Sequence, residues 1–272
     1  MVTKKFLSAA SIICALALLT STTNAGHSWA SYHWERSANP LKLDLGDNLT
    51  SIWDQSLIIA SADWSKSKVL DTTIVAGGTK PKRCRPTRGR VEVCNSRYGN
   101  NGWLGLAQIW ISGDHITQGV VKNNDYYFDL PTYDSPEWRL FVTCQEVGHN
   151  FGLTHQDVNF NNANLGSCMD YTSDPGSNQH PNDHDYAELE SIYADLDPVQ
   201  VDDGGGNCNP RSPKCNAGFS GPPAFDDLDL DGPGQWGRLI GASASGRTSV
   251  YELDFGNGNK IITHVIWALE SD

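Results

Sequence analysis

Hydrophobic and polar positions follow two rhythms in the first two hundred residues, and together they predict an α+β fold. Residues 41–45 alternate apolar with polar side chains, as a half-buried strand does, and apolar residues in 48–63 recur at helical spacing. Similar patterns predict strands at 69–76, 90–93 and 104–112, and helices at 135–151 and 183–196. Several strands with three helices that do not alternate regularly with them are typical of an α+β domain.

A change in composition divides the chain after this domain. Residues 201–215 are rich in glycine, proline and asparagine, which is typical of a linker. Three strands are predicted beyond it, at 236–242, 248–255 and 260–269, with a hairpin turn in the Gly-Asn-Gly-Asn run between the last two. We therefore expect a main domain over 26–200 and a small β-rich module over 216–272.

The first 25 residues have the features of a secretory signal peptide. Lys4 and Lys5 precede an apolar run from 6 to 19, and Thr-Asn-Ala ends at Ala25, where we expect cleavage. The apolar run is shorter than the roughly 20 residues that a membrane-spanning helix needs. We therefore predict a secreted, extracellular protein without a membrane anchor.

The spacing of the cysteines is consistent with export, and the net charge bears on the possible partners. Cleavage at Ala25 would leave six cysteines, and the short separations between successive ones favour the disulfides Cys84–Cys94, Cys144–Cys168 and Cys208–Cys215. The formal net charge of −12 argues against nucleic acid or anionic membranes as partners. The basic segment 80–90 is interpreted as a solvated loop closed by a disulfide.

The most informative segment is residues 145–155. Gln145 and His149 are one helical turn apart, so both project from the same face of the helix with Glu146 beside them. Gly152 permits a sharp end to the helix, and the chain can then return His155 to the same point. Three such ligands leave a fourth position of a zinc ion open for water, and a neighbouring carboxylate can accept a proton from that water.

The segment resembles the metzincin zinc metalloproteases, whose motif is H-E-x-x-H-x-x-G-x-x-H followed by a methionine turn. The chain matches the motif at Glu146, His149, Gly152 and His155, and Gln145 stands where the motif has its first histidine. Met169 is similar in placement to the methionine of the turn. Tyr171, two residues further on, resembles the tyrosine that helps to stabilise the oxyanion in astacins and serralysins. The helix at 183–193 resembles the last helix of the matrixin catalytic domain.

The resemblance implies a metzincin-like catalytic domain, with a twisted mixed sheet and two to three helices, that acts as a secreted zinc-dependent endopeptidase on protein or peptide substrates. Zn²⁺ would be held by Gln145, His149 and His155, with Glu146 as general base and Tyr171 assisting. The strand at 103–112 would be the sheet edge that pairs with an extended substrate. The Cys144–Cys168 disulfide would brace the methionine turn against the ligand helix.

Gln145 leaves three alternatives open, because zinc prefers histidine, cysteine or carboxylate ligands. The glutamine can ligate zinc through its amide oxygen. Alternatively, zinc is held by His149 and His155 together with Tyr171 or additional water. In the third alternative the chain is a catalytically inactive secreted binding protein that keeps the fold.

Other candidate ligands are interpreted as structural. His115, His180 and His184 lie in the main domain, where loop hydrogen bonds and helix capping are their expected roles. The oxygen-rich segment 157–164 is interpreted as a loop of Asx turns. Residues 227–232 resemble the start of a calcium loop, but Pro233 and Arg238 interrupt the pattern, so Ca²⁺ is only a minor candidate. The oligomeric state is not predicted.

Overall fold

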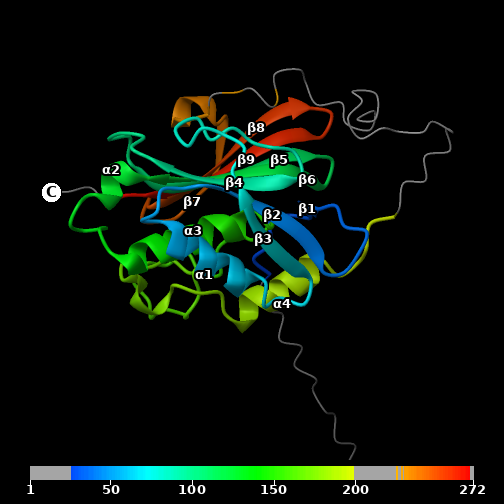
Figure 1. Cartoon of the computed structure of the whole chain (residues 1–272), viewed down its shortest axis with the longest axis horizontal. Coiled ribbons are helices and arrows are strands. Elements are labelled where there is room, and N and C mark those ends of the chain that lie inside the picture. The colour runs from blue at the N-terminus through cyan, green and yellow to red at the C-terminus, as the bar shows by residue number, and fades with distance from the viewer. Residues whose placement is uncertain (1–25, 199–224, 226–227, 229, 270–272) are drawn as a thin grey trace, which may run out of the picture.

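The structure is a computed structural model that describes residues 26–198, 225, 228 and 230–269 (Figure 1). The predicted signal peptide, the predicted linker and the proposed Cys208–Cys215 pair lie outside the described residues, as do Asp227 and Asp229 of the candidate calcium segment.

The described chain forms an α+β fold around one mixed sheet of nine strands, with four α-helices. The strand order is β3-β2-β4-β6-β5-β9-β8-β7, and β1 pairs with β6. Strands β1 to β4 and β6 run parallel, while β5, β7, β8 and β9 make antiparallel pairs. The strands are β1 His33–Trp34, β2 Leu41–Asn48, β3 Leu70–Ala76, β4 Arg90–Ser96, β5 Trp103–Ser112, β6 His115–Asn124, β7 Arg238–Ala242, β8 Thr248–Gly256 and β9 Asn259–Trp267.

The longer helices lie on one face of the sheet, and a short helix follows β6 directly at the end of the sheet (Figure 1). The helices are α1 Asp54–Trp64, α2 Asp125–Phe128, α3 Pro136–His149 and α4 Asp183–Ile192. Helix α1 packs against α3, and α3 packs against β5 and β6. Trp64 at the end of α1 is fully buried and donates a hydrogen bond from Nε1 to the carbonyl of Cys144 at 3.1 Å. The main hydrophobic core therefore lies between α1, α3 and the sheet.

A second hydrophobic core covers the opposite face of the sheet. Trp103, Leu106 and Trp110 of β5 pack there with Val265 of β9 and with Trp236, which follows the 3-10 helix Pro233–Gln235. The indole nitrogen of Trp110 donates to the carbonyl of Phe225 at 2.8 Å. The C-terminal part of the chain thus supplies half of this second core.

Two expectations about the C-terminal strands need correction. The strands are present at the predicted places, but β9 pairs with β5 along its whole length, so they extend the main sheet instead of forming an appendage. For the same reason β5 is internal, whereas we expected it at an edge. Strand pairing depends on contacts between residues that are distant in sequence, and a local change in composition does not indicate them.

Four other elements differ from the prediction, and of these the short β1 and α2 were not predicted at all. The helix expected from residue 48 begins at Asp54, because Asn48 still belongs to β2 and the Asn48 side chain bonds Glu92 of β4 at 2.7 Å. Strand β6 was not predicted. Its sequence carries the polar residues Gln118, Lys122 and Asn123, which are buried, so it lacks the apolar run expected of an internal strand.

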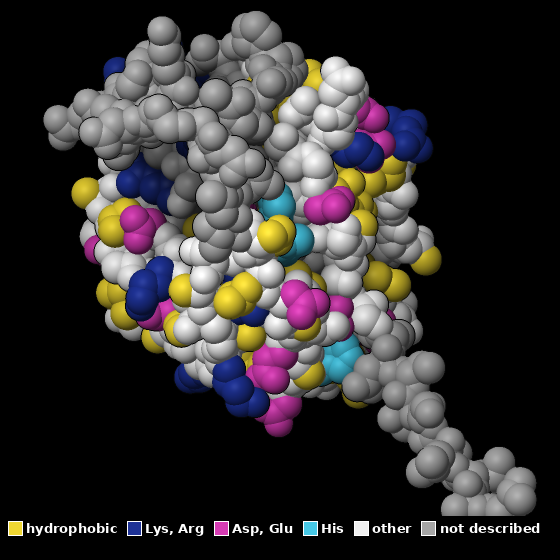
Figure 2. Space-filling model, turned by 90° about the vertical axis from the view of Figure 1, so that its right-hand side faces the viewer, with side chains coloured by type: hydrophobic (Ala, Val, Ile, Leu, Met, Phe, Trp, Pro, Cys, Tyr) yellow, Lys and Arg dark blue, Asp and Glu magenta, His cyan; other side chains and the backbone are white. Residues whose placement is uncertain are grey.

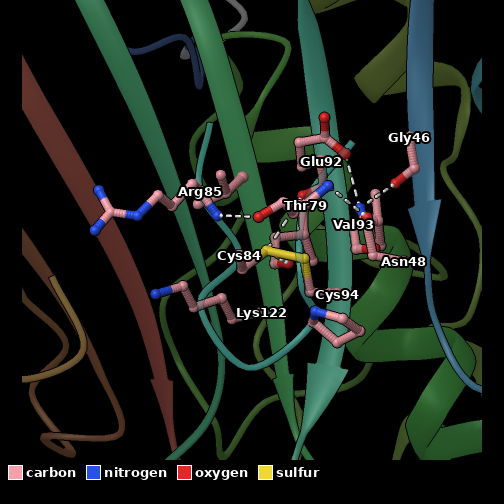
Figure 3. Close-up of a disulfide and its surroundings, with 12 residues drawn as sticks. Gly46, Asn48, Thr79, Cys84, Arg85, Glu92, Val93, Cys94 and Lys122 are labelled. Carbon is pink, nitrogen blue, oxygen red and sulfur yellow. Dashed lines mark hydrogen bonds between the residues drawn. A yellow bond between two sulfur atoms is a disulfide. The ribbon is translucent and has the colours of Figure 1, made fainter. Parts of the chain in front are cut away.

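Both predicted disulfides within the described residues are confirmed. Cys84–Cys94 fixes the basic loop to β4, where Glu92 and Asn48 are hydrogen-bonded beside it (Figure 3). The amide of Arg85 donates to Thr79 Oγ1 at 2.9 Å within the same loop. Cys144–Cys168 joins α3 to the segment before Met169. Disulfides are typical of proteins exported to an oxidising compartment.

Candidate metal centre

Helix α3 positions the first half of the candidate site. Ser135 caps its N-terminus by accepting a hydrogen bond from the amide of Trp138 at 3.3 Å, and Pro136 occupies the first turn, where a missing N–H costs nothing. The last five residues of α3 include Gln145, Glu146 and His149, all at most 1% exposed. These three side chains therefore project from a helix whose N-terminus is capped and whose C-terminal turn is buried.

The turn after α3 returns His155 to the helix. Gly152 has φ of +94°, and a Cβ atom there would lie 2.4 Å from the carbonyl oxygen of Tyr32, so glycine is required. The Nε2 atoms of His149 and His155 are 3.1 Å apart. Two nitrogens bound at about 2.0 Å to one tetrahedral zinc ion would be about 3.3 Å apart. The pair of imidazoles thus has the spacing of two ligands to one metal.

Both histidines are neutral, and a hydrogen bond fixes the tautomer of His149. Nδ1 of His149 donates to the carbonyl of Leu153 at 2.8 Å, which leaves Nε2 with its lone pair facing His155. Burial lowers the pKa of His149 to about 4, and burial together with the neighbouring His149 and His264 lowers that of His155 well below its ordinary value. Both imidazoles are therefore neutral at neutral pH, as metal ligation requires.

Among the described residues, the side-chain amide of Gln145 makes its hydrogen bond through the nitrogen alone. Its Nε2 donates to the carbonyl of Cys168 at 2.9 Å, which fixes the orientation of the amide. Its Oε1 is buried and has no hydrogen-bond partner among the described residues. A buried carbonyl oxygen without a partner is energetically unfavourable, and a cation would satisfy it.

Glu146 is buried against β5. A Cβ atom at Gly105 would lie 2.5 Å from Val142 and 3.3 Å from Glu146 Cγ, so the strand approaches the helix closely here. Oε2 of Glu146 has no hydrogen-bond partner within the part of the chain that the structure describes. Burial raises the pKa of this carboxyl well above its ordinary value, which makes it a stronger proton acceptor.

Met169 lies beneath the end of α3. A Cβ atom at Gly148 would be 2.6 Å from Met169 Sδ and 2.6 Å from Trp64, so only glycine allows this packing in the turn that carries His149. The Cys144–Cys168 disulfide joins the residue before Gln145 to the residue before Met169. The structure thus places Met169 against the ligand helix, next to the predicted disulfide.

Tyr171 contacts His155. Their ring centroids are 4.1 Å apart, and the phenol oxygen is hydrogen-bonded by the hydroxyl of Thr248 in β8. Burial raises the pKa of Tyr171 above its ordinary value, so the phenol remains protonated at neutral pH. The predicted neighbourhood of Tyr171 and the histidine pair is therefore present.

His264 is a site residue that the sequence analysis missed. It belongs to β9, where Ile262, His264 and Ile266 alternate toward α3, and its ring stacks on that of His149 with centroids 4.0 Å apart. Both of its ring nitrogens are buried without a hydrogen-bond partner in the described chain. The only sequence signal was one histidine among the apolar residues of the strand, in a segment that we had assigned to a separate module.

An open pocket of about 240 Å³ leads to this group. Its walls come from three parts of the fold: Trp29 near the start of the described chain, the loop that carries His155 and Val158, and strands β7 to β9. His155, Tyr171 and His264 line this pocket, whereas β9 occupies the side of β5.

The other candidate ligands lie elsewhere. His115 pairs with His33 and Asp197, His180 bonds Asp63 at 2.6 Å, and His184 lies at the start of α4. Within the described residues, the groups of three or more His, Cys, Asp or Glu side chains with ligand atoms within 4.8 Å of one another are His27–His184–Asp185 and His33–His115–Asp197. Among those residues, no third side chain of those four types joins His149 and His155 at that distance.

The loop from Asp157 has the expected Asx turns. The amide of Asn159 donates to Asp157 Oδ1 at 2.7 Å, and the amide of Asn161 donates to Asn159 Oδ1 at 3.0 Å. The local side-chain oxygens are thus used by the backbone of the loop itself.

In the described part of the chain, none of the helices is long and apolar enough to cross a membrane. Comparison of the chain with known protein families and with curated proteins gives no match.

Proposed function

We propose that the chain is a secreted zinc-dependent peptidase of metzincin type, with Glu146 as its general base. The observation that carries the proposal is the approach of two neutral Nε2 atoms, those of His149 and His155, to 3.1 Å beside a buried carboxylate. Nε2 of His149 is the acceptor in this contact, and the 3.1 Å separation is close to that of two imidazoles that bind one cation.

The donor set fits zinc. His149 and His155 would hold the ion through Nε2, and the unpartnered Oε1 of Gln145 would complete three protein ligands. A zinc ion held there would supply Lewis acidity, which polarises a carbonyl group and makes water a better nucleophile. Because an amide oxygen is a weaker zinc donor than imidazole, we expect this chain to hold the ion less tightly than a three-histidine site would.

Glu146 would move the proton. Its raised pKa allows the carboxylate to take a proton from water and to pass it to the amine that leaves when the peptide bond breaks. Tyr171 remains protonated and can donate a hydrogen bond to an oxygen that becomes negatively charged during the reaction. Both groups lie next to the histidine pair, on α3 and after Met169 respectively.

The position of β9 favours a second candidate function. An extended peptide cannot add to β5, because β9 already makes those backbone hydrogen bonds. A substrate would have to enter through the 240 Å³ pocket beside Tyr171 and His264. If the pocket is too restricted for a polypeptide, the chain would be an inactive binding protein that retains the site.

The experiment that separates these functions is casein cleavage by the zinc-loaded protein with a Glu146→Gln variant, which keeps the size of the side chain. We expect cleavage to fall by at least about 100-fold, because general-base catalysis contributes that much or more. Zinc content should be unchanged. Glu137→Gln, on the exposed first turn of the same helix, is the matched control and should cleave like the wild type. Zinc-loaded protein that cleaves equally with and without Glu146, or never cleaves, would exclude the peptidase.

A further inference from the structure

A second group of ligand-type side chains lies between the start of the described chain and the first turn of α4. His27, His184 and Asp185 each place one ligand atom within 4.8 Å of those of the other two. The two imidazole rings stack with centroids 4.9 Å apart. Figure 2 views the molecule from the right-hand side of Figure 1 and shows histidine and acidic side chains at that surface, whereas His27 and Asp185 are buried.

Three atoms in this group are buried without a hydrogen-bond partner in the described chain. They are Nε2 of His27, Nδ1 of His184 and Oδ1 of Asp185. His27 and Asp185 are 4% and 0% exposed, and the two unpartnered atoms on them are 3.4 Å apart. Buried polar atoms nearly always have a partner, so three unpartnered ones at one point indicate a ligand that binds all three.

The remaining atoms of these side chains are fixed by the fold. Nδ1 of His27 donates to the carbonyl of Thr154 at 2.9 Å, so Nε2 carries the free lone pair. Oδ2 of Asp185 accepts from Ser167 Oγ at 2.6 Å and from the amide of Asn182 at 2.7 Å. The second of these bonds belongs to the capping box that begins α4. Hydrogen bonds of this kind orient a ligand toward a metal before it binds.

The other histidine–aspartate group differs in this respect. Nε2 of His33 and Nε2 of His115 lie 3.2 Å and 3.0 Å from Oδ1 of Asp197, and Nδ1 of His33 bonds the carbonyl of Ser31. Its three side chains are partly exposed, and none of their atoms is among the buried atoms without a partner in the described chain, so nothing there requires a cation.

We propose that His27, His184 and Asp185 bind a second divalent cation of the zinc class. Two imidazole nitrogens and one carboxylate oxygen are a donor set that suits zinc and the neighbouring borderline metals, and not calcium or magnesium, which prefer oxygen ligands. The proposal does not depend on the proposed peptidase, since none of its ligands belongs to that site.

The second cation would stabilise the two loops that carry His155 and Met169. His27 is bonded to Thr154, the residue before His155, through side chain and backbone. Ser167, which bonds Asp185, also accepts the amide hydrogen of Met169 at 2.8 Å. A cation at His27–His184–Asp185 therefore fastens the first described residues to the two loops that carry His155 and Met169.

The test is the zinc content of the full chain after removal of metal with a chelator, reloading with zinc and desalting. We expect the wild type to retain two zinc ions, His184→Ala one, and the double variant His149→Ala/His155→Ala one. In the double variant, zinc should still raise the midpoint of thermal unfolding, and adding His184→Ala should abolish that shift. His115→Ala, in the hydrogen-bonded group with His33, is the matched control and should retain two.

His184 is chosen because it is half-buried and its Nδ1 has no hydrogen-bond partner in the described chain, and His184→Gln provides a second variant of similar size. If His184→Ala and His184→Gln retain as much zinc as the wild type, or the double variant retains none, the second site is wrong. If instead the double variant retains as much as the wild type and His184→Ala retains none, the second site stands and the proposed peptidase centre fails.

Discussion

At the scale of single residues, the candidate centre is defined by buried polar atoms with unmet bonding capacity. Oε1 of Gln145 and Oε2 of Glu146 lie within one turn of His149 and have no partner in the described residues. Burying such groups costs about 1–3 kcal/mol each, so the fold would be more stable if these positions were apolar. Their presence beside a histidine pair is explained by a role in binding or catalysis.

Gln145→His tests the third ligand. An imidazole binds zinc more strongly than an amide oxygen, so the variant should retain zinc against a chelator at a concentration at least about 10-fold higher. Competition with a chromogenic chelator measures this retention. Gln145→Leu, which keeps the volume and removes the oxygen, is the control and should lose zinc more easily than the wild type. Equal retention in all three proteins would place residue 145 outside the set of ligands.

At the scale of elements, the sequence predicted the features that depend on residues close to one another in the chain. Helix α3, the turn at Gly152 and both disulfides of short separation were predicted because each depends on residues close in sequence. Strand β6 was missed because its buried Lys122 is neutralised by Asp231, a partner from the far end of the chain. Local patterns cannot indicate such a partner.

Gly148→Ala tests the contact between α3 and Met169. Alanine usually stabilises a helix relative to glycine by about 1 kcal/mol, but here the new methyl group would meet Met169 Sδ and Trp64 at 2.6 Å. Overpacking of this kind costs about 1–3 kcal/mol, so we expect a net loss in the free energy of unfolding. Urea denaturation measures it. Ser191→Ala, at an exposed position of α4, is the control and should not destabilise. A stabilised Gly148→Ala protein would contradict the packing described.

At the scale of the whole molecule, strand β9 adds His264 to the candidate site and closes the free side of β5. The composition break at 201–215 suggested two units, but β9 completes the sheet beside β5 and brings His264 onto His149. The motif on α3 was visible in sequence because its residues are neighbours in the chain. The pairing of β9 with β5 and the position of His264 were not visible in the sequence, because both depend on contacts between residues 103–112 and 259–267.

A shared sheet predicts cooperative unfolding. The second core joins Trp103 and Trp110 of β5 to Trp236 and Val265, so neither part can keep its apolar surface buried alone. We expect differential scanning calorimetry of the full chain to give one transition, with the calorimetric enthalpy equal to the van 't Hoff enthalpy. Two separate transitions would show that the C-terminal strands form an independent unit.

The most direct test of the proposed metal centre is anomalous scattering at the zinc edge from crystals of the zinc-loaded protein. The account predicts a peak bonded to Nε2 of both His149 and His155, at about 2.0–2.1 Å from each nitrogen. The same peak should lie within bonding distance of Oε1 of Gln145. Crystals of fully loaded protein with no anomalous peak between these two histidines would contradict the account.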